Sequence, residues 1–204
     1  MPEILRIISL NVHRISFRDS LDEITNWGLA RQSGFVCFAN VHMTIEAYKD
    51  PLFQQDLDKA RLVLADGRPI AAACNWLYKK RQERIAGMDF MPAILQKANE
   101  SKAKIFLYGS TEEVLKKLIE KIKLDYPNAL VAGAISPPFR NLSQQELQEH
   151  IQQINDSGAN FVLVALGCPK QEKWMAANFR SIQAILLGLG GAFQVAAGIQ
   201  KRCP

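Results

Sequence analysis

Short apolar runs alternate with longer amphipathic stretches along most of this chain of 204 residues. We interpret the apolar runs as buried strands: Phe35–Ala39, Leu62–Ala65, Lys104–Tyr108, Ala129–Ala134, Phe161–Leu166 and Ala184–Leu187. Strands that alternate with helices predict an α/β fold with a largely parallel sheet flanked by helices. A Rossmann-like core is the arrangement that we expect.

The sequence also predicts the structure of the first segment and the positions of the helices. Residues Leu5–Ile15 alternate roughly and are rich in aliphatic side chains, which predicts a strand or a strand pair. Ser20 and Glu23 match a capping box, so we expect Ser20 to be the N-cap of a helix that runs to Arg31. Further helices are expected at 41–48, 51–60, 70–80, 87–101, 109–124 and 143–155. No repeat or linker interrupts the pattern, so residues 1–204 are expected to form a single domain.

Composition and charge narrow the class of protein. Apolar residues make up 48% and charged residues 22% of the chain, which is ordinary for a soluble globular protein. The net charge of +5 permits an anionic ligand or a membrane surface, and no nucleic acid is expected. The densest basic run, Lys79–Arg84, is more simply interpreted as a solvated face than as a binding patch. With no signal peptide and no spanning segment in view, we expect a cytoplasmic protein.

Cysteine and histidine spacing gives no support for a metal or a disulfide framework. The cysteines lie far apart without C-x-x-C pairing, and the histidines are not at metal-ligand spacing: Cys37, Cys74, Cys168 and Cys203; His13, His42 and His150. Cys168 lies beside the predicted site, but no partner base can be named, so we interpret it as a packed thiol. We expect neither a metal nor a cofactor.

Two strand ends in the last third of the chain are the most informative. Phe161–Leu166 is followed by Gly167 and Cys168–Glu172, and Ala184–Leu187 is followed by the segment G-L-G-G. Open parallel sheets bind ligands at the carboxyl ends of strands, where helix N-termini present free N–H groups. These ends therefore predict a site for an anionic ligand such as a nucleotide or a phosphorylated sugar.

The residues after these strands offer specific contacts. Pro169 suits the first turn of a helix, and Lys170 with the free N–H groups could bind phosphate. Gln171 and Glu172 could hydrogen-bond ribose hydroxyls, although charged residues commonly begin helices. The glycine segment matches only part of the dinucleotide pattern G-x-G-x-x-G, which is weak support for NAD.

Asp66 is the first candidate for catalysis. It follows a predicted strand and precedes Gly67, so its carboxylate should stand at the carboxyl edge of the sheet and could accept a proton from an attacking hydroxyl. From position alone, capping of the following turn is the simpler interpretation. Asn40 could donate to and accept from a sugar or base edge. His42 could be a general base or merely a polar residue on a half-buried helix.

Six motifs, in this order, resemble the WecG/TagA/CpsF glycosyltransferase family. They are F-A-N-V-H-M around Asn40, L-A-D-G-R-P around Asp66, E-R-I-A-G-M-D-F from Glu83, F-L-Y-G-S, G-C-P-K-Q-E-K-W and G-L-G-G-A-F. The resemblance covers nearly the whole chain, from Leu5 to Pro204. Each motif is short, but their order and spacing make the set specific.

The resemblance implies an inverting, metal-independent transferase. Such enzymes move N-acetylmannosamine or a related sugar from a UDP-sugar to a lipid-linked, polyprenyl diphosphate acceptor at the inner face of the cell membrane, in teichoic acid or exopolysaccharide synthesis. The net charge of +5 also predicts weak association with an acidic membrane surface, and the resemblance is compatible with a homo-oligomer. The resemblance reverses the position-based interpretation of Asp66, which becomes the general base, with Asn40 and His42 completing the catalytic group. The substrate-binding residues would be Gly67, Arg84, Asp89, Gly109, Ser110, Gly167, Pro169, Lys170, Gln171, Glu172, Gly190, Gly191, Phe193 and Gln194.

Two departures from the family pattern leave alternatives open. The family usually has an aspartate after G-G-A-F, where this chain has Gln194, and it usually continues with a basic tail where this chain stops after Lys201-Arg202-Cys203-Pro204. We therefore keep a catalytically impaired nucleotide-sugar-binding protein as an alternative. An NAD(P)-dependent oxidoreductase is a weaker one, because too few residues follow Gly191 to supply the ribose-binding acid.

Overall fold

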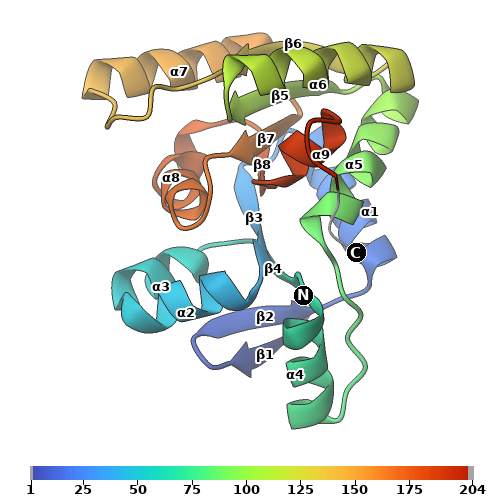
Figure 1. Cartoon of the computed structure of the whole chain (residues 1–204), viewed down its shortest axis with the longest axis vertical. Coiled ribbons are helices and arrows are strands. Elements are labelled where there is room, and N and C mark those ends of the chain that lie inside the picture. Colours follow the sequence, from blue (N-terminus) through green and yellow to red (C-terminus); the bar gives the residue numbers. More distant parts are fainter. Residues whose placement is uncertain (1, 202–204) are drawn as a thin grey trace.

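The computed structural model describes residues 2–201 and shows a single α/β domain (Figure 1). Six parallel strands form its sheet in the order β4-β3-β8-β7-β5-β6, which confirms the predicted fold class. Their bounds are β3 Gly34–Ala39, β4 Leu62–Ala65, β5 Lys104–Gly109, β6 Leu130–Ile135, β7 Phe161–Ala165 and β8 Ile185–Gly188. Cys203 and the end of the chain lie outside the described residues.

Helices cover both faces of the sheet because both faces of its central strands are apolar. On β3, Phe35 and Cys37 belong to one core cluster, whereas Val36 and Phe38 belong to the other. The first cluster is covered by α2 (Val41–Lys49), α3 (Pro51–Leu57), α4 (Arg68–Tyr78), α7 (Gln144–Ser157) and α8 (Lys170–Asn178). The second is covered by α1 (Phe17–Leu29), α5 (Gly87–Ser101), α6 (Glu112–Asp125) and α9 (Ala192–Ala196). A short 3-10 helix, η1 (Phe179–Ser181), follows α8.

The segment predicted as a strand pair is an antiparallel hairpin of β1 (Glu3–Ile7) and β2 (Leu10–Arg14). It lies beside β4, the edge strand of the main sheet. The Val63 N–H donates to Nδ1 of His13 at 3.0 Å, so a side chain of the hairpin satisfies a backbone donor of the edge strand.

The predicted start of the first helix is wrong by one turn. Ser16, not Ser20, is the N-cap of α1, and its Oγ accepts from the Asp19 N–H at 3.0 Å. Ser20 is fully buried inside the helix and donates to the carbonyl of Phe17 at 2.8 Å. The earlier start places the Phe17 ring 5.4 Å from that of Phe90, so packing selects between two serines with similar capping patterns.

Close contact between strand ends shapes the carboxyl edge of the sheet. Gly109, at the end of β5, has φ +105°, and a Cβ there would overlap the carbonyl of Ala165 at the end of β7. The parallel register pairs Ala39 with Ala65 and Gly109 with Ala165. The ends of these neighbouring strands therefore form one continuous edge.

Candidate active site

The predicted site residues lie in a row along the carboxyl edge of the sheet. Asp66 follows β4, Asn40 follows β3, Gly190 lies just beyond β8, Gly167 lies just beyond β7, and Gly109 ends β5. Neighbouring strands are about 4.8 Å apart, so the three steps from β4 to β7 correspond to about 14 Å. Residues far apart in sequence thus share one elongated site.

Asp66 lies at one end of this row in a half-buried position. Its backbone N–H donates to the Ala39 carbonyl at 2.8 Å, and the Gly87 N–H lies 3.5 Å from its Oδ2. Burial raises the pKa of the Asp66 carboxyl, while the Gly87 N–H and the Arg84 charge oppose the rise. A raised pKa makes the ionised carboxylate a stronger proton acceptor.

Arg84 and Asp89 lie next to Asp66 as an ion pair with a separation of 3.6 Å. Both act on the pKa of Asp66, in opposite directions. Arg84 is exposed and Asp89 is half-buried in the first turn of α5. The E-R-I-A-G-M-D-F segment therefore adjusts the charge around Asp66.

Asn40 and His42 have different roles in the local structure. Asn40 is the N-cap of α2, and its Oδ1 accepts from the Met43 N–H at 3.0 Å. This bond uses one of the two lone pairs of Oδ1, and the exposed amide NH₂ could donate to a ligand. His42 is exposed in the first turn of α2, and its charge is close enough to lower the pKa of Glu172.

Gln171 and Glu172 are buried, which differs from the expectation that both reach a ribose. Gln171 donates through Nε2 to Glu172 Oε1 at 2.7 Å and to the Gly188 carbonyl at 3.2 Å. Gln171 Oε1 has no partner and faces Gly190, where an added Cβ would lie 3.3 Å away. Glu172 therefore lies beneath the site, while Gln171 presents an acceptor toward the glycine segment.

Cys168 lies in surroundings that disfavour its thiolate. Burial raises its pKa well above the ordinary value, and the neighbouring Glu172 raises it further. A thiol of this kind is a poor nucleophile. The structure thus agrees with the interpretation of Cys168 as a packed residue.

A cavity of about 520 Å³ opens where β5 and β7 end, at the other end of the row from Asp66. Its floor contains Tyr108 and Trp174, whose rings are stacked with centroids 4.2 Å apart. Phe139, 91% exposed, adds a third aromatic ring. Ser110 and Lys170 are the predicted residues that line it.

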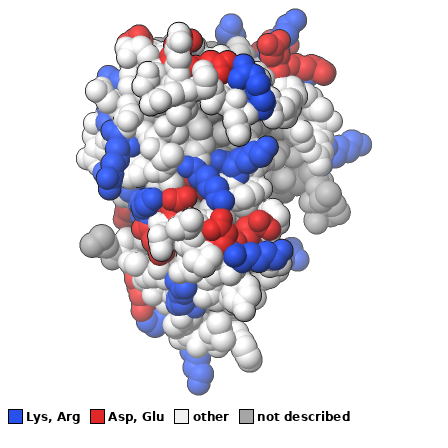
Figure 2. Space-filling view, turned by 90° about the vertical axis from the view of Figure 1, so that its left-hand side faces the viewer, with Lys and Arg blue, Asp and Glu red and all other residues white. Residues whose placement is uncertain are grey.

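Basic residues surround the cavity. Arg140 pairs with Glu146 at 2.5 Å and Lys173 pairs with Asp50 at 2.7 Å, whereas Lys170 has no ion-pair partner within residues 2–201. Figure 2, which views the face of α8, α2 and α3, shows Lys and Arg side chains across its middle, with acidic ones among them. Lys170 is thus available to an anionic ligand.

Several of these cavity residues were not assigned from the sequence: Tyr108, Phe139, Arg140, Lys173 and Trp174. Phe139 and Arg140 lie in the loop P-P-F-R that follows β6. An exposed aromatic next to arginine, directly after a strand, was the signal available there.

Of the remaining predicted residues, Phe193 lies in the core, and the others lie at the starts of helices. Phe193 is fully buried in the core beneath α9, so its ring is a packing element and not a ligand contact. Gly191 and Gln194 are exposed at the start of α9. Gly67 precedes α4 with φ +92°, and Pro169 precedes α8. These positions lie at the carboxyl edge of the sheet, as predicted.

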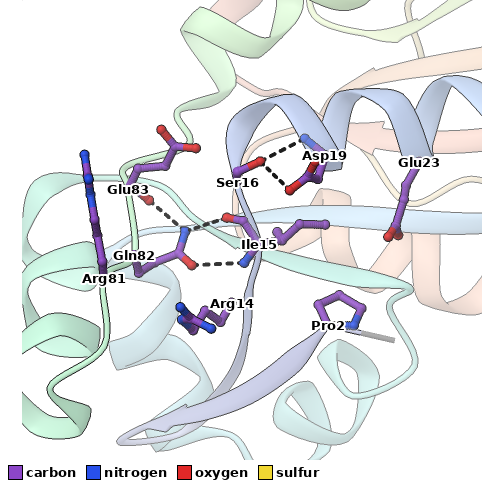
Figure 3. Close-up of a pocket in the computed structure, with 9 residues that line it drawn as sticks. All are labelled: Pro2, Arg14, Ile15, Ser16, Asp19, Glu23, Arg81, Gln82 and Glu83. Carbon is purple, nitrogen blue, oxygen red and sulfur yellow. Dashed lines mark hydrogen bonds between the residues drawn. The ribbon is translucent and has the colours of Figure 1, made fainter.

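A second cavity, of about 700 Å³, lies between the hairpin, the start of α1 and the connection from α4 to α5 (Figure 3). Its lining mixes both charges and includes none of the predicted site residues: Pro2, Arg14, Ile15, Ser16, Asp19, Glu23, Arg81, Gln82 and Glu83. Gln82 is buried, accepts from the Ile15 N–H at 3.0 Å and donates to the Ile15 carbonyl at 2.9 Å. These hydrogen bonds hold the segment between α4 and α5, which also contains Arg84, against the end of β2.

Gln82→Ala is expected to lower the free energy of unfolding by about 1–3 kcal/mol, because it removes two hydrogen bonds to the partly buried backbone of Ile15, each worth about 0.5–1.5 kcal/mol. Urea unfolding measures the change. The control is Gln145→Ala on the exposed face of α7, which should be nearly silent. Equal, small effects of both substitutions would show that Gln82 does not hold this connection.

The fold is that of an α/β protein, with an elongated candidate ligand site across the carboxyl edge of a parallel sheet. A family model described as "Glycosyl transferase WecG/TagA/CpsF family" matches residues 5–204, and the chain belongs to this family. Within residues 2–201, no group of three or more His, Cys, Asp or Glu side chains is placed to hold a metal ion.

Curated relatives carry the name N-acetylglucosaminyldiphosphoundecaprenol N-acetyl-beta-D-mannosaminyltransferase. The chain is 33% identical to one from Bacillus spizizenii over 85% of its own length and 66% of the relative. It is 34% identical to one from Bacillus subtilis (81% and 63%) and 26% identical to one from Staphylococcus aureus (83% and 65%). The chain thus spans slightly less than two thirds of the length of these relatives.

Proposed function

We propose that this chain is the core of a glycosyltransferase that moves N-acetylmannosamine, or a related sugar, from a UDP-sugar to a lipid-linked acceptor. The relatives' names describe an acceptor of the N-acetylglucosaminyl-diphosphoundecaprenol type. The observation that carries the proposal is the row along the sheet edge, with a basic aromatic cavity at one end and Asp66 at the other.

The donor would lie across the strand ends. Its base would occupy the cavity against Phe139, with the diphosphate near Lys170 and the start of α8. The sugar would then extend past Gly190 and Asn40 toward Asp66. The distance of about 14 Å between β7 and β4 is one that the diphosphate and sugar of an extended nucleotide sugar can span.

The proposed reaction is an inverting displacement. Asp66 would take the proton of the acceptor hydroxyl while the hydroxyl oxygen bonds to the anomeric carbon. The bond from that carbon to the UDP oxygen breaks on the opposite face, and UDP leaves with the electron pair. Lys170 and the positive end of α8 would stabilise its charge without a metal ion. Gln171 Oε1 would accept from a sugar hydroxyl or amide.

The acceptor would place the reaction at a membrane surface, on the cytoplasmic side where nucleotide sugars are made. None of the helices within residues 2–201 has the length and apolar character that a bilayer crossing requires.

Thermal unfolding with different nucleotides tests the proposed donor. UDP and UDP-N-acetylmannosamine should raise the melting temperature in the presence of EDTA, because a ligand that binds only the native state stabilises it by about 2.7 kcal/mol at 100 times its Kd. NAD and GDP-sugars are the comparison ligands. Stabilisation by NAD with no effect of UDP or UDP-sugars would contradict the transferase and favour an oxidoreductase.

A further inference from the structure

The carboxyl-terminal end of α4 exposes large apolar side chains to solvent. Trp76 is 81% exposed and Leu77 is 54% exposed. The next residue, Tyr78, donates its hydroxyl to the Arg6 carbonyl at 2.8 Å, which fixes the end of α4 to the hairpin. Ile8, in the turn of that hairpin, is 69% exposed. We call Ile8, Trp76, Leu77, Lys79 and Arg81 the α4 tip.

Basic residues follow the apolar ones directly. Lys79 and Arg81 are exposed and form no ion pair within residues 2–201, whereas Lys80 pairs with Glu3. The acidic residues nearby are engaged: Glu3 also pairs with Arg14, and Glu83 accepts from the Phe17 N–H. The free charge of the α4 tip is therefore positive. In Figures 1 and 2, α4 ends at the lowest point of the molecule, where basic side chains project among uncharged ones.

Tryptophan and aliphatic side chains beside lysine and arginine are the combination that anchors proteins at the bilayer–water interface. The indole lies at the level of the headgroups, and the cations attract anionic lipids. We propose that the α4 tip docks this protein on an anionic lipid bilayer. The inference rests on the proposed function in one respect, because a lipid-linked acceptor requires the site to approach a membrane.

The position of α4 connects the α4 tip to the site. The helix begins at Arg68, two residues after Asp66, and its eleven residues give a length of about 16 Å. A membrane at the α4 tip would therefore lie within reach of Asp66 for a sugar held on a membrane-bound diphosphate. The helix would act as a spacer between the bilayer and the catalytic edge.

Charge argues against a second copy of the chain as the occupant. A two-fold contact through this surface would bring Lys79 and Arg81 of both copies together, and like charges repel at such an interface. An anionic bilayer instead complements them. The densest basic run of the sequence, first interpreted as a solvated face, thus becomes part of a docking surface.

Vesicle binding tests the proposal without acceptor or nucleotide. The chain should bind vesicles of phosphatidylcholine with 30% phosphatidylglycerol and should bind pure phosphatidylcholine much more weakly, with binding lost as the salt concentration rises. The test variant is Trp76→Gln/Lys79→Gln/Arg81→Gln. Removing two cations at about 1 kcal/mol each, together with the indole, should weaken binding by at least about 30-fold.

The matched control is Lys121→Gln/Lys123→Gln/Leu124→Gln at the end of α6, which removes the same charge and one exposed apolar side chain. It should bind like the unsubstituted chain. Equal loss in both variants, or no preference for anionic vesicles, would overturn the proposal. So would a dimer of the unsubstituted chain that the Trp76 variant converts to a monomer. UDP stabilisation is measured in parallel, and its failure would count against the proposed function alone.

Discussion

Asp66→Asn is expected to slow sugar transfer by about 10²–10⁴-fold, because in the proposed mechanism it removes the group that accepts the proton of the attacking hydroxyl. UDP affinity should hardly change, since Asp66 lies about 14 Å from the nucleotide cavity. Transfer to a lipid-linked acceptor and calorimetric titration with UDP measure the two quantities. Asp125→Asn, an exposed change at the end of α6, is the control.

A full-rate Asp66→Asn enzyme would remove Asp66 from the mechanism. Asparagine caps turns as well as aspartate does, so an Asp66 that only caps the turn would give a silent substitution. His42, exposed in the first turn of α2, would then be the next candidate for the base.

The same variant is expected to be more stable than the unsubstituted chain at neutral pH. Burial raises the pKa of Asp66, so folding favours its protonated form. That stabilising contribution is present below the ordinary pKa of aspartate and is lost as the pH rises through the raised value. Urea unfolding should show a gain for Asp66→Asn at pH 7 that shrinks toward pH 3. A loss of stability at pH 7 would contradict a desolvated carboxylate.

Phe139→Ala is expected to weaken UDP binding by about 1–3 kcal/mol, or roughly 5- to 150-fold, which is the range for a base stacked on an aromatic ring. Phe139 is 91% exposed, so the free energy of unfolding should stay nearly constant. Calorimetric titration with UDP in EDTA measures the effect. Leu124→Ala, at an 80% exposed position outside the cavity, is the control. Unchanged UDP affinity would place the base elsewhere.

The strands were predictable because a parallel sheet buried on both faces requires continuous apolar runs, as Phe35–Ala39 and Phe161–Leu166 show. The polar residues at the strand ends were predictable because each apolar run stops where the chain leaves the buried sheet. The lateral order of the strands was not, since local patterns do not say that β8 separates β3 from β7. That order is what lines up Asp66 and the cavity.

The burial of individual polar side chains could not be predicted from the sequence. Gln171 and Glu172 look like ordinary polar residues at a helix start, yet packing of α8 against β8 places them under the surface. Burial raises the pKa of Glu172, so the group beside Gln171 resists ionisation. The stacked rings of Tyr108 and Trp174 come from different elements, and only the fold brings them together.

The direction of the bound nucleotide is the most direct test of the site. A crystal structure with UDP in metal-free buffer should place the base in the cavity at Phe139 and the diphosphate near Lys170, directed past Gly190 toward Asp66. A nucleotide in the cavity beside the hairpin, or one whose diphosphate runs from β5 toward β6, would contradict the account.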